Sequence, residues 1–376
     1  MIHRLLGTVV SITTDRPGIQ EIEVECEGSP GSLRIAVNIT DLTGLVSVGD
    51  IVELNTAAVE MGLGTGGFDF VISVRNRPHA EKEPPGHIMK LRYTPVQIPV
   101  LALESPESPL HDTLAEFSGL DETPVVCFEL HSQLPAICAS IHWALNECGR
   151  SGRVVYVMTD GASLPLVFSR LVPQLKERRL LHDTITAGHA FGGDFEAVNI
   201  YSAIAAAKIA LKADVIVVGQ GPGNVGTETA LGFSGIDQGL AVNAAASLGG
   251  VPIFVPRISF ADARSRHIGL SHHSLTNLTK VVRAPAILPV PRLTKFELNR
   301  LYSVLEQHNI LDTHDVVTVD AEKGMKALEE CGIPVTTMGR GLTAERAFFL
   351  ASCASGLLAA QLVEARAVQA QRTDSE

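Results

Sequence analysis

The sequence is poor in charged residues and especially poor in basic ones. Charged residues make up 19% of the 376 positions and hydrophobic residues 45%, a balance that forms a buried core and excludes a disordered chain. Acidic residues outnumber basic ones 41 to 30, for a formal net charge of −11. A general nucleic-acid binder needs clustered Lys and Arg to neutralise phosphates. We therefore expect no nucleic acid as a partner.

Cysteine is scarce and unpatterned. The six residues show neither CxxC pairing nor zinc-site spacing, and they are Cys26, Cys127, Cys138, Cys148, Cys331 and Cys353. Most stand among apolar neighbours, as small hydrophobic side chains do. This pattern predicts reduced thiols and a cytoplasmic protein.

The sequence predicts neither a targeting segment nor a membrane span. Residues 1–7 run into a strand-like pattern without the features of a signal peptide. Only residues 347–363 approach the length of a membrane span, and Ser352, Ser355 and Gln361 interrupt them. We expect a packed, alanine-rich helix there and no membrane partner.

Familiar catalytic motifs and repeats are missing as well. The sequence has no GxSxG turn, which argues against serine-hydrolase chemistry, and no HExxH pair that would mark a metalloprotease. No internal repeat of fixed period is evident. A function has to be inferred from less specific patterns.

Residues 1–78 predict a small β-barrel-like module. Short β-rich runs are separated by turn signals roughly every ten residues, which suits about five strands. The glycine-rich stretch at residues 62–67 lies between two of these runs and predicts a hairpin turn, in preference to a phosphate cradle. The module holds five Arg, no Lys and ten acids, so nucleic-acid binding by this barrel is not expected. Residues 79–96 are polar and punctuated by proline, and they predict a linker.

Residues 97–376 have a different sequence pattern, which is typical of an α/β ligand-binding domain. Apolar strand-like runs occur at residues 100–103, 125–128, 154–157, 184–186, 215–218, 252–255, 286–288, 316–319 and 335–337. Helix-length apolar stretches such as 203–211 and 240–248 lie between them. This alternation predicts an α/β fold with a largely parallel, doubly wound sheet, preceded by the barrel-like module.

Polar residues follow five of the predicted strands. They are His131, Asp160, His189, the loop of residues 219–229 and Arg257. In a parallel sheet, ligands bind beyond the carboxyl ends of the strands. One such residue alone is more often a helix cap or a turn former, but five in succession predict a shared pocket.

The loop of residues 219–229 is rich in glycine. Its candidate ligand-binding residues are Gly221, Gly223, Gly226 and Thr227, and the three glycines match the GxGxxG dinucleotide fingerprint. Further glycines interrupt the helix that should follow, and the next strand ends in Arg257 where an NAD site needs an acid. NAD or FAD is therefore not expected. Backbone N–H groups here could hold another anion, or the loop could serve packing alone.

Residues 257–274 concentrate arginine and histidine. Arg257, Arg264 and Arg266 face a single acid, Asp262, and the candidate proton-transfer residues are His267, His272 and His273. Guanidinium is a forked donor for phosphate or carboxylate, and imidazole can carry a proton near neutral pH. The alternative is a solvated surface loop.

A divalent metal is a further hypothesis. Asp160, His189 and Asp194 follow two successive strands and would supply mixed ligands. No ligand spacing obliges them to converge. Asp194 could equally be the N-cap of the helix that follows it.

Seven segments together resemble a known family. They are residues 89–95, 130–135, 156–162 and 188–194, the loop of residues 219–229, and residues 258–273 and 338–340. The chain resembles, over nearly its whole length, an uncharacterised bacterial family of unknown function found chiefly in Gram-positive lineages. The resemblance implies a bacterial cytoplasmic protein and supplies no catalytic roles.

Two functions fit these patterns. The first is an enzyme for a small phosphorylated or carboxylated metabolite, with catalytic candidates Asp160, His189, His267, His272 and His273, and with His131, the glycine loop and the three arginines as ligand-binding groups. The alternative is a non-catalytic ligand-sensing or regulatory protein that self-associates through the β-module into a homo-oligomer. Both need the same pocket.

Overall fold

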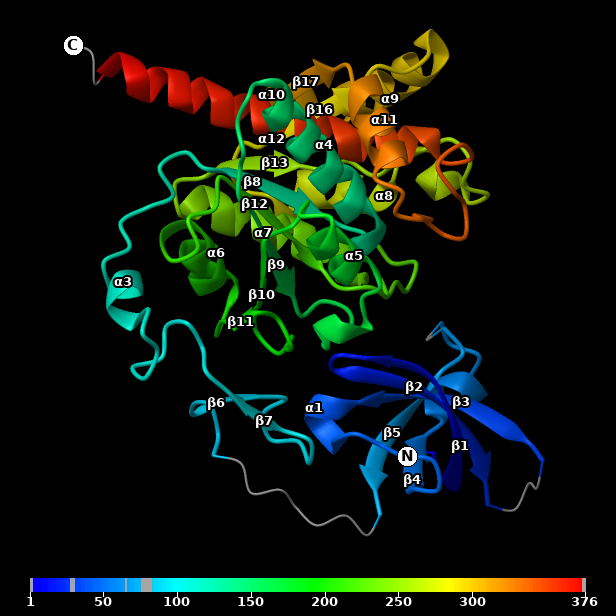
Figure 1. Cartoon of the computed structure of the whole chain (residues 1–376). Coiled ribbons are helices and arrows are strands. Elements are labelled where there is room, and N and C mark those ends of the chain that lie inside the picture. Colours follow the sequence, from blue (N-terminus) through cyan, green and yellow to red (C-terminus); the bar gives the residue numbers. More distant parts are fainter. Residues whose placement is uncertain (1–2, 28–30, 65, 76–82, 374–376) are drawn as a thin grey trace. The chain divides into compact units, whose positions relative to one another are not determined.

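A computed structural model describes residues 3–27, 31–64, 66–75 and 83–373 of the chain (Figure 1). The chain divides into two units. The first contains Met1–Val100 and Pro165–Phe168, and the second contains Leu101–Leu164 and Ser169–Glu376. Residues 79–82 of the predicted linker lie outside the described residues, and its later part contains strand β6 (Ile88–Lys90).

The first unit holds a closed five-stranded barrel. Its strands are β1 (Arg4–Arg16), β2 (Ile19–Cys26), β3 (Leu33–Ile39), β4 (Ile51–Asn55) and β5 (Asp69–Val74), in the order β1-β2-β3-β5-β4. All neighbouring pairs are antiparallel except β3 with β5. Alternate residues of β2, such as Ile22 and Val24, point into the barrel core because successive strand residues face opposite sides. The predicted barrel module is confirmed.

Short elements complete the first unit. They are α1 (Thr40–Thr43), α2 (Ala57–Glu60) and a two-stranded antiparallel sheet of β6 and β7 (Ile98–Val100). The glycine-rich stretch at residues 62–67 follows α2, in the connection between the antiparallel strands β4 and β5. Residue 65 of that stretch is outside the described residues.

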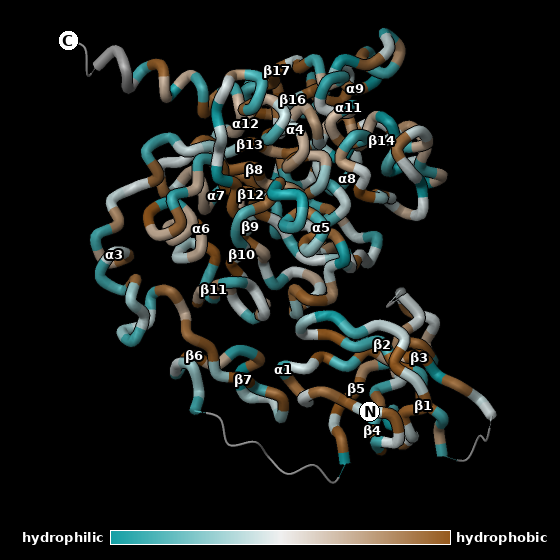
Figure 2. Tube along the Cα trace, in the orientation of Figure 1, coloured by the Kyte–Doolittle hydropathy of each residue, from teal (hydrophilic) through white to brown (hydrophobic). Residues whose placement is uncertain are grey.

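The second unit is built on an eight-stranded parallel sheet. Its strands are β8 (Pro124–Phe128), β9 (Val154–Thr159), β10 (Asp183–Thr186), β11 (Phe195–Glu196), β12 (Val215–Gln220), β13 (Val251–Phe254), β16 (Ile287–Pro291) and β17 (Asp315–Val319). The order is β11-β10-β9-β12-β8-β13-β16-β17, and every neighbouring pair is parallel. The central strands are apolar along their length (Figure 2) because both faces of the sheet are covered. The predicted α/β class is confirmed.

Helices cover both faces. The principal ones are α3 (His111–Ala115), α4 (Leu134–Glu147), α5 (Leu171–Glu177), α6 (Ile200–Ile209), α7 (Asp237–Ser247), α8 (His272–Thr276), α9 (Lys295–Gln307), α10 (Ile310–Thr313), α11 (Glu322–Glu330) and α12 (Arg346–Thr373). The connections through α4 and α5 run along the sheet in one direction, and those through α6 and α7 run in the other. Since parallel crossovers are right-handed, the two pairs lie on opposite faces. In agreement, α4 packs on α5, and α6 packs on α7.

Helix α12 is the only candidate membrane span among the described residues. The segment Arg346–Gln369 is long and apolar enough to cross a bilayer, but 78% of its most apolar window is buried inside the protein. It packs along α4 and over the sheet (Figure 1). This burial favours the predicted packed helix.

Two strand predictions need correction. Residues 335–337 form no strand. Thr337 makes only an isolated bridge to Arg340, across a turn in which Met338 and Gly339 have positive φ. Its apolar pattern reflects burial, since Val335 is buried in an extended loop. Of the predicted run at residues 100–103, only Val100 lies in a strand, at the end of β7, and Ala102 makes an isolated bridge to Glu196.

Candidate functional site

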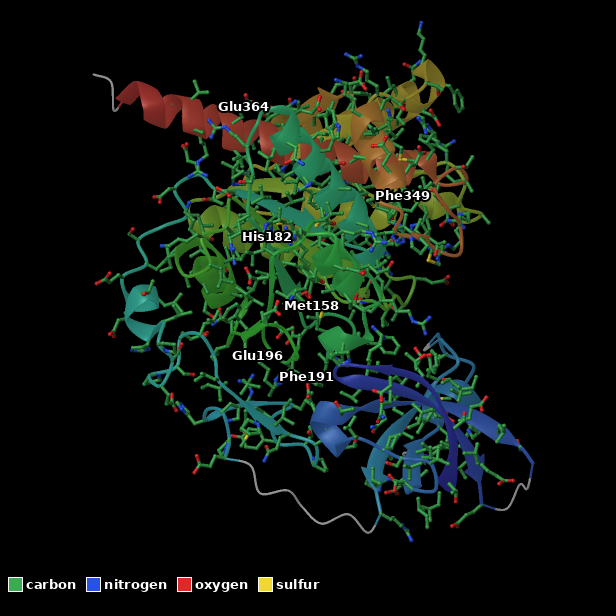
Figure 3. All side chains as sticks on the ribbon, in the orientation of Figure 1. Met158, His182, Phe191, Glu196, Phe349 and Glu364 are labelled. Atoms are coloured by element: carbon green, nitrogen blue, oxygen red, sulfur yellow. The ribbon has the colours of Figure 1, made fainter. Side chains whose placement is uncertain are left out.

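The carboxyl edge of the sheet carries the candidate site. In Figure 3, His182 marks the amino end of β10, and Met158, Phe191 and Glu196 lie toward the opposite edge. The chain leaves β8 toward the α4 face and leaves the neighbouring strands β12 and β13 toward the α7 face. A reversal of this kind opens a crevice between adjacent strands, which is where ligands bind in open α/β sheets. Glu129, Gln220 and Arg257 lie at this reversal.

Glu129 lies at the centre of the polar contacts at this reversal. Its side chain is fully buried, and its Oε1 accepts hydrogen bonds from Asn224 Nδ2 (2.9 Å) and Arg257 Nη1 (3.3 Å). His273 Nδ1 lies 2.6 Å from the same oxygen. The other oxygen, Oε2, is buried without a hydrogen-bond partner. A buried carboxylate with one free oxygen is costly to maintain, and such groups concentrate at functional sites.

The charge state of Glu129 follows from these neighbours. Burial by itself raises the pKa of the carboxyl, but the hydrogen bond from His273 and the charge of Arg257 outweigh it, so the pKa is lowered. The carboxylate is therefore ionised at neutral pH. It holds His273 with Nδ1 as the donor, which leaves Nε2 of that ring as the free nitrogen.

Three histidines converge next to this carboxylate. The ligand atoms of His267, His272 and His273 all lie within 4.8 Å of one another. His272 and His273 open α8, and His267 comes from the short 3-10 turn that precedes β15 (Gly269–Leu270). Phe233 stacks on the ring of His273 at a centroid distance of 3.9 Å, which fixes the plane of that imidazole. We call these three residues the histidine cluster.

Ser271 contacts a further nitrogen of the cluster. Ser271 Oγ lies 2.8 Å from Nδ1 of His267, and it also accepts the backbone N–H of His273 as the N-cap of α8. His272 Nε2 is buried without a partner. Burial lowers the pKa of His267 to about 3, helped by the charge of Arg257, and burial followed by the neighbouring His273 lowers the pKa of His272 to about 4. Both imidazoles are neutral near pH 7.

The arginines predicted to bind an anion are already paired with carboxylates. Arg257 is buried and contacts Glu129, and Arg264 makes a bidentate contact with Asp262 at 2.9 Å from both nitrogens. Arg266 pairs with the exposed Glu228 at 3.0 Å. The local surplus of positive charge expected from the sequence is therefore cancelled.

A further arginine completes this ion-pair network. Arg340 bridges Asp262 and Glu345, and Glu345 also accepts from Ser259 Oγ. The Arg264 hydrogen bond lowers the pKa of Asp262 well below its usual range. Three arginines, at 257, 264 and 340, thus face three carboxylates, at 129, 262 and 345, and the formal charge of the network is zero.

His131 lies apart from the histidine cluster. It is buried at the end of β8, its Nε2 is 2.7 Å from Ser169 Oγ, and its Nδ1 is 3.4 Å from the hydroxyl of Tyr156. Burial lowers its pKa to about 4. These contacts describe a neutral histidine packed in the second unit, and no contact with the cluster joins it to the predicted ligand site within the described ranges.

The predicted metal ligands Asp160, His189 and Asp194 do not form a ligand set. Asp160 Oδ2 accepts the backbone N–H of His189 at 2.8 Å. Asp194 accepts from the backbone and hydroxyl of Thr184 and pairs with Lys176. The one group of three His, Cys, Asp or Glu with mutually close ligand atoms, among residues that the structure describes, is the histidine cluster.

The alternative role of Asp194 as a helix cap is wrong. Asn199 is the N-cap of α6, because its side-chain oxygen accepts from the backbone of Tyr201 and Ser202. Asn at this position satisfies two N–H groups that would otherwise be unpaired in the first turn. Asp194 instead holds the turn between β10 and β11.

The glycine loop does not lead directly into a helix. After Gly223, which has φ of +101°, the chain makes an antiparallel excursion in which Gly226 bridges Phe233 and Thr227 bonds to Gly232. Helix α7 begins only at Asp237. Gly221 packs closely, since a Cβ there would meet Ser163 O at 2.9 Å. The loop contributes Asn224 to the site and the segment returning from it contributes Phe233. The glycine pattern predicted neither role.

An open pocket of about 320 Å³ lies elsewhere in the second unit. Its lining is mostly apolar and comprises Glu104, His111, Leu114, Ala115, Phe117, Tyr201, Ser202, Ala205 and Leu248. Neither Glu129 nor any residue of the histidine cluster lines this pocket. We place the chemistry at the histidine cluster because the polar groups converge there.

Sequence reasoning missed Glu129, Asn224 and Phe233. Glu129 was visible as a single acid directly after the apolar run of β8, a position that signals a buried charge. Asn224 lies in the loop of residues 219–229, and Phe233 lies just after it. Only the glycines and Thr227 of that loop were predicted to bind a ligand. The role of Asn224 and Phe233 depends on a fold that brings loops of β8, β12 and β13 together.

Comparison with known proteins identifies a family and no function. No curated protein matches the chain, and no solved structure matches it. The family described as "Protein of unknown function (DUF3866)" matches residues 35–356, which include all seven segments that carried the predicted resemblance. The chain belongs to this family of unknown function.

Proposed function

We propose that the protein is an enzyme that acts on a small phosphorylated or carboxylated metabolite at the carboxyl edge of its sheet. The observation that carries this proposal is the 2.6 Å contact between the buried Glu129 and His273 Nδ1, within a cluster of three imidazoles. A carboxylate that fixes the tautomer of a histidine is a recurrent device of proton-transfer sites. In this account Glu129 positions His273 and makes the free nitrogen of its ring, Nε2, a stronger base and ligand.

The anionic substrate is supported by the outer part of the ion-pair network. Arg264 and Arg340 are only partly buried, and each guanidinium offers five N–H donors, more than its carboxylate contacts use. A phosphate or carboxylate could therefore bind to the remaining donors without breaking the existing pairs. The six cysteines are free, four of them buried, which supports the cytoplasmic setting that we also propose.

The test is turnover of a metabolite mixture by the full-length chain. Wild-type protein is incubated with phosphorylated and carboxylated metabolites, and depleted or newly formed compounds are identified by mass spectrometry. Glu129→Gln should lower kcat/KM by at least about 100-fold, because positioned acid–base groups contribute factors of this size. Glu322→Gln is the matched control, since Glu322 lies in an exposed ion pair with Arg346.

The fold of each variant is checked by circular dichroism, because Glu129→Gln leaves the buried Arg257 with a weaker partner. If that variant does not fold, His272→Ala, at a partly exposed position, replaces it. Turnover that is unchanged in a folded variant would contradict the proposed centre. Saturable binding of a metabolite without turnover would favour the ligand-sensing alternative.

A further inference from the structure

We propose that the Nε2 atoms of His267, His272 and His273 bind one divalent transition-metal ion of the zinc type. The inference rests on the proposed function, because it names the cofactor of the same reaction centre. It differs from the metal site expected at Asp160, His189 and Asp194, which the fold does not assemble. The histidine cluster is the only such group among residues with described positions.

The orientation of the rings supports metal binding. Nδ1 of His273 is engaged by Glu129 and Nδ1 of His267 by Ser271, so in both rings the nitrogen that remains is Nε2. His272 Nε2 is buried and unpartnered. Metal-bound histidines commonly donate their second nitrogen to a carboxylate or hydroxyl, which fixes the ring and strengthens the ligand. Two of the three rings have this support.

The distances are compatible with one ion. A tetrahedral ion with metal–nitrogen bonds of about 2.05 Å separates its ligand nitrogens by roughly 3.3 Å. One ring nitrogen from each histidine lies within 4.8 Å of the other two, so bringing three nitrogens at this spacing onto one ion requires them to close by about 1.5 Å. Rotation of His272, which is partly exposed, could supply much of this movement.

The donor set selects the class of ion. Three imidazole nitrogens suit zinc, iron, cobalt, nickel or copper, whereas magnesium and calcium prefer oxygen ligands. Three protein ligands leave a fourth position for water or substrate, as in catalytic zinc sites, while structural zinc sites use four protein ligands. An ion bound there would lower the pKa of a coordinated water, which could then serve as a base in the proposed reaction.

Packing alone does not account for the cluster. Stacking on Phe233 explains the position of the His273 ring. It does not explain why His272 Nε2 and Glu129 Oε2 are both buried without partners, since buried polar atoms are almost always hydrogen-bonded. A bound ion satisfies the first of these atoms directly.

A bound ion would also change the net charge of the site. The ion-pair network of Arg257, Arg264 and Arg340 with their carboxylates is formally neutral. A divalent cation would add two positive charges at the histidine cluster. This addition gives the site the preference for anionic substrates that its arginines, already paired, supply only weakly.

The metal content of the full-length protein tests the inference. Protein purified without chelator is analysed by mass spectrometry of metals, then stripped with chelator and titrated with Zn²⁺ and Co²⁺ separately. We expect about one ion per chain in the wild type and less than about a tenth in His272→Ala, since two remaining ligands bind weakly. His142→Gln, a partly exposed histidine of α4, should retain the wild-type stoichiometry.

A second variant tests the positioning role of Glu129. Glu129→Gln keeps an acceptor for His273 but removes the charge, and the metal Kd should rise by about 10- to 100-fold. Wild-type protein that takes up neither ion, or a His272→Ala variant that keeps its ion, would overturn the inference. An ion bound without any turnover would refute the proposed enzyme and keep the metal site, whereas turnover that resists chelation would do the reverse.

Discussion

Glu129 is a buried charge, and removing a carboxylate from water costs several kcal/mol unless partners offset it. Its partners are His273, Arg257 and Asn224, which lie between 95 and 144 residues away in the sequence. No local pattern could reveal that they meet. The individual histidines at 267, 272 and 273 were predictable as candidates because a run of Arg and His is unusual in an acidic chain. Their common centre was not, because it depends on the fold around α8.

His131 supports a prediction about acid stability. Its pKa is about 4 in the folded protein and near 6.5 in the unfolded chain. The unfolded state therefore binds more protons between these values, so this contribution to stability is complete above pH 6.5 and is lost as the pH falls toward 4. The free energy of unfolding, measured with urea, should fall between pH 7 and pH 4. In His131→Asn this fall should be about 3 kcal/mol smaller than in the wild type.

The control for this experiment is His308→Asn, since His308 is exposed at the end of α9. It should show the same pH dependence as the wild type. If His131→Asn also keeps the full wild-type dependence, His131 is not the group that resists protonation. A protonated His131 in the folded protein would require a different account of its contacts with Ser169 and Tyr156.

At the scale of elements, strands were more predictable than loops. The strands of the large sheet are continuous apolar runs, and this pattern reflects burial on both faces. The same logic failed at residues 335–337, where the apolar pattern belongs to a buried loop. The GxGxxG pattern at residues 221–226 precedes an antiparallel excursion and not a helix, because hydrogen bonds between residues 225–227 and 232–234 close it on itself.

The short turn before α7 supports a prediction about packing. A Cβ at Gly235 would lie 2.6 Å from Glu129 Cγ, whereas a Cβ at Gly226 would have no neighbour closer than 3.8 Å. Neither glycine has a positive φ, so the contrast is steric alone. Gly235→Ala should lower the free energy of unfolding by about 1–3 kcal/mol and weaken zinc binding by roughly 10-fold.

Gly226→Ala is the matched control and should change the free energy of unfolding by less than about 0.5 kcal/mol. Urea unfolding and zinc titration of the two variants provide the comparison. Equal effects of the two substitutions would show that Glu129 can move freely. Its position would then not depend on the close approach of Gly235.

At the scale of the whole molecule, the division into a barrel unit and an α/β unit was predictable in outline. Strand-dense sequence without helical patterns precedes strand–helix alternation, and the two periodicities differ. The strand order was not predictable, because β12 follows β8 to β11 in the chain but lies between β9 and β8 in the sheet. That insertion places the loops of β8, β12 and β13 side by side, and the candidate site depends on it.

The most direct test of the account is the X-ray absorption spectrum of the zinc-loaded, full-length protein. We expect three imidazole nitrogens at about 2.0–2.1 Å from the zinc ion and one further light atom at a similar distance from it. His272→Ala should lose this spectrum under the same loading. Sulfur scattering at about 2.3 Å, or a first shell of oxygen atoms without imidazole, would contradict the claim that the histidine cluster is a metal-dependent reaction centre.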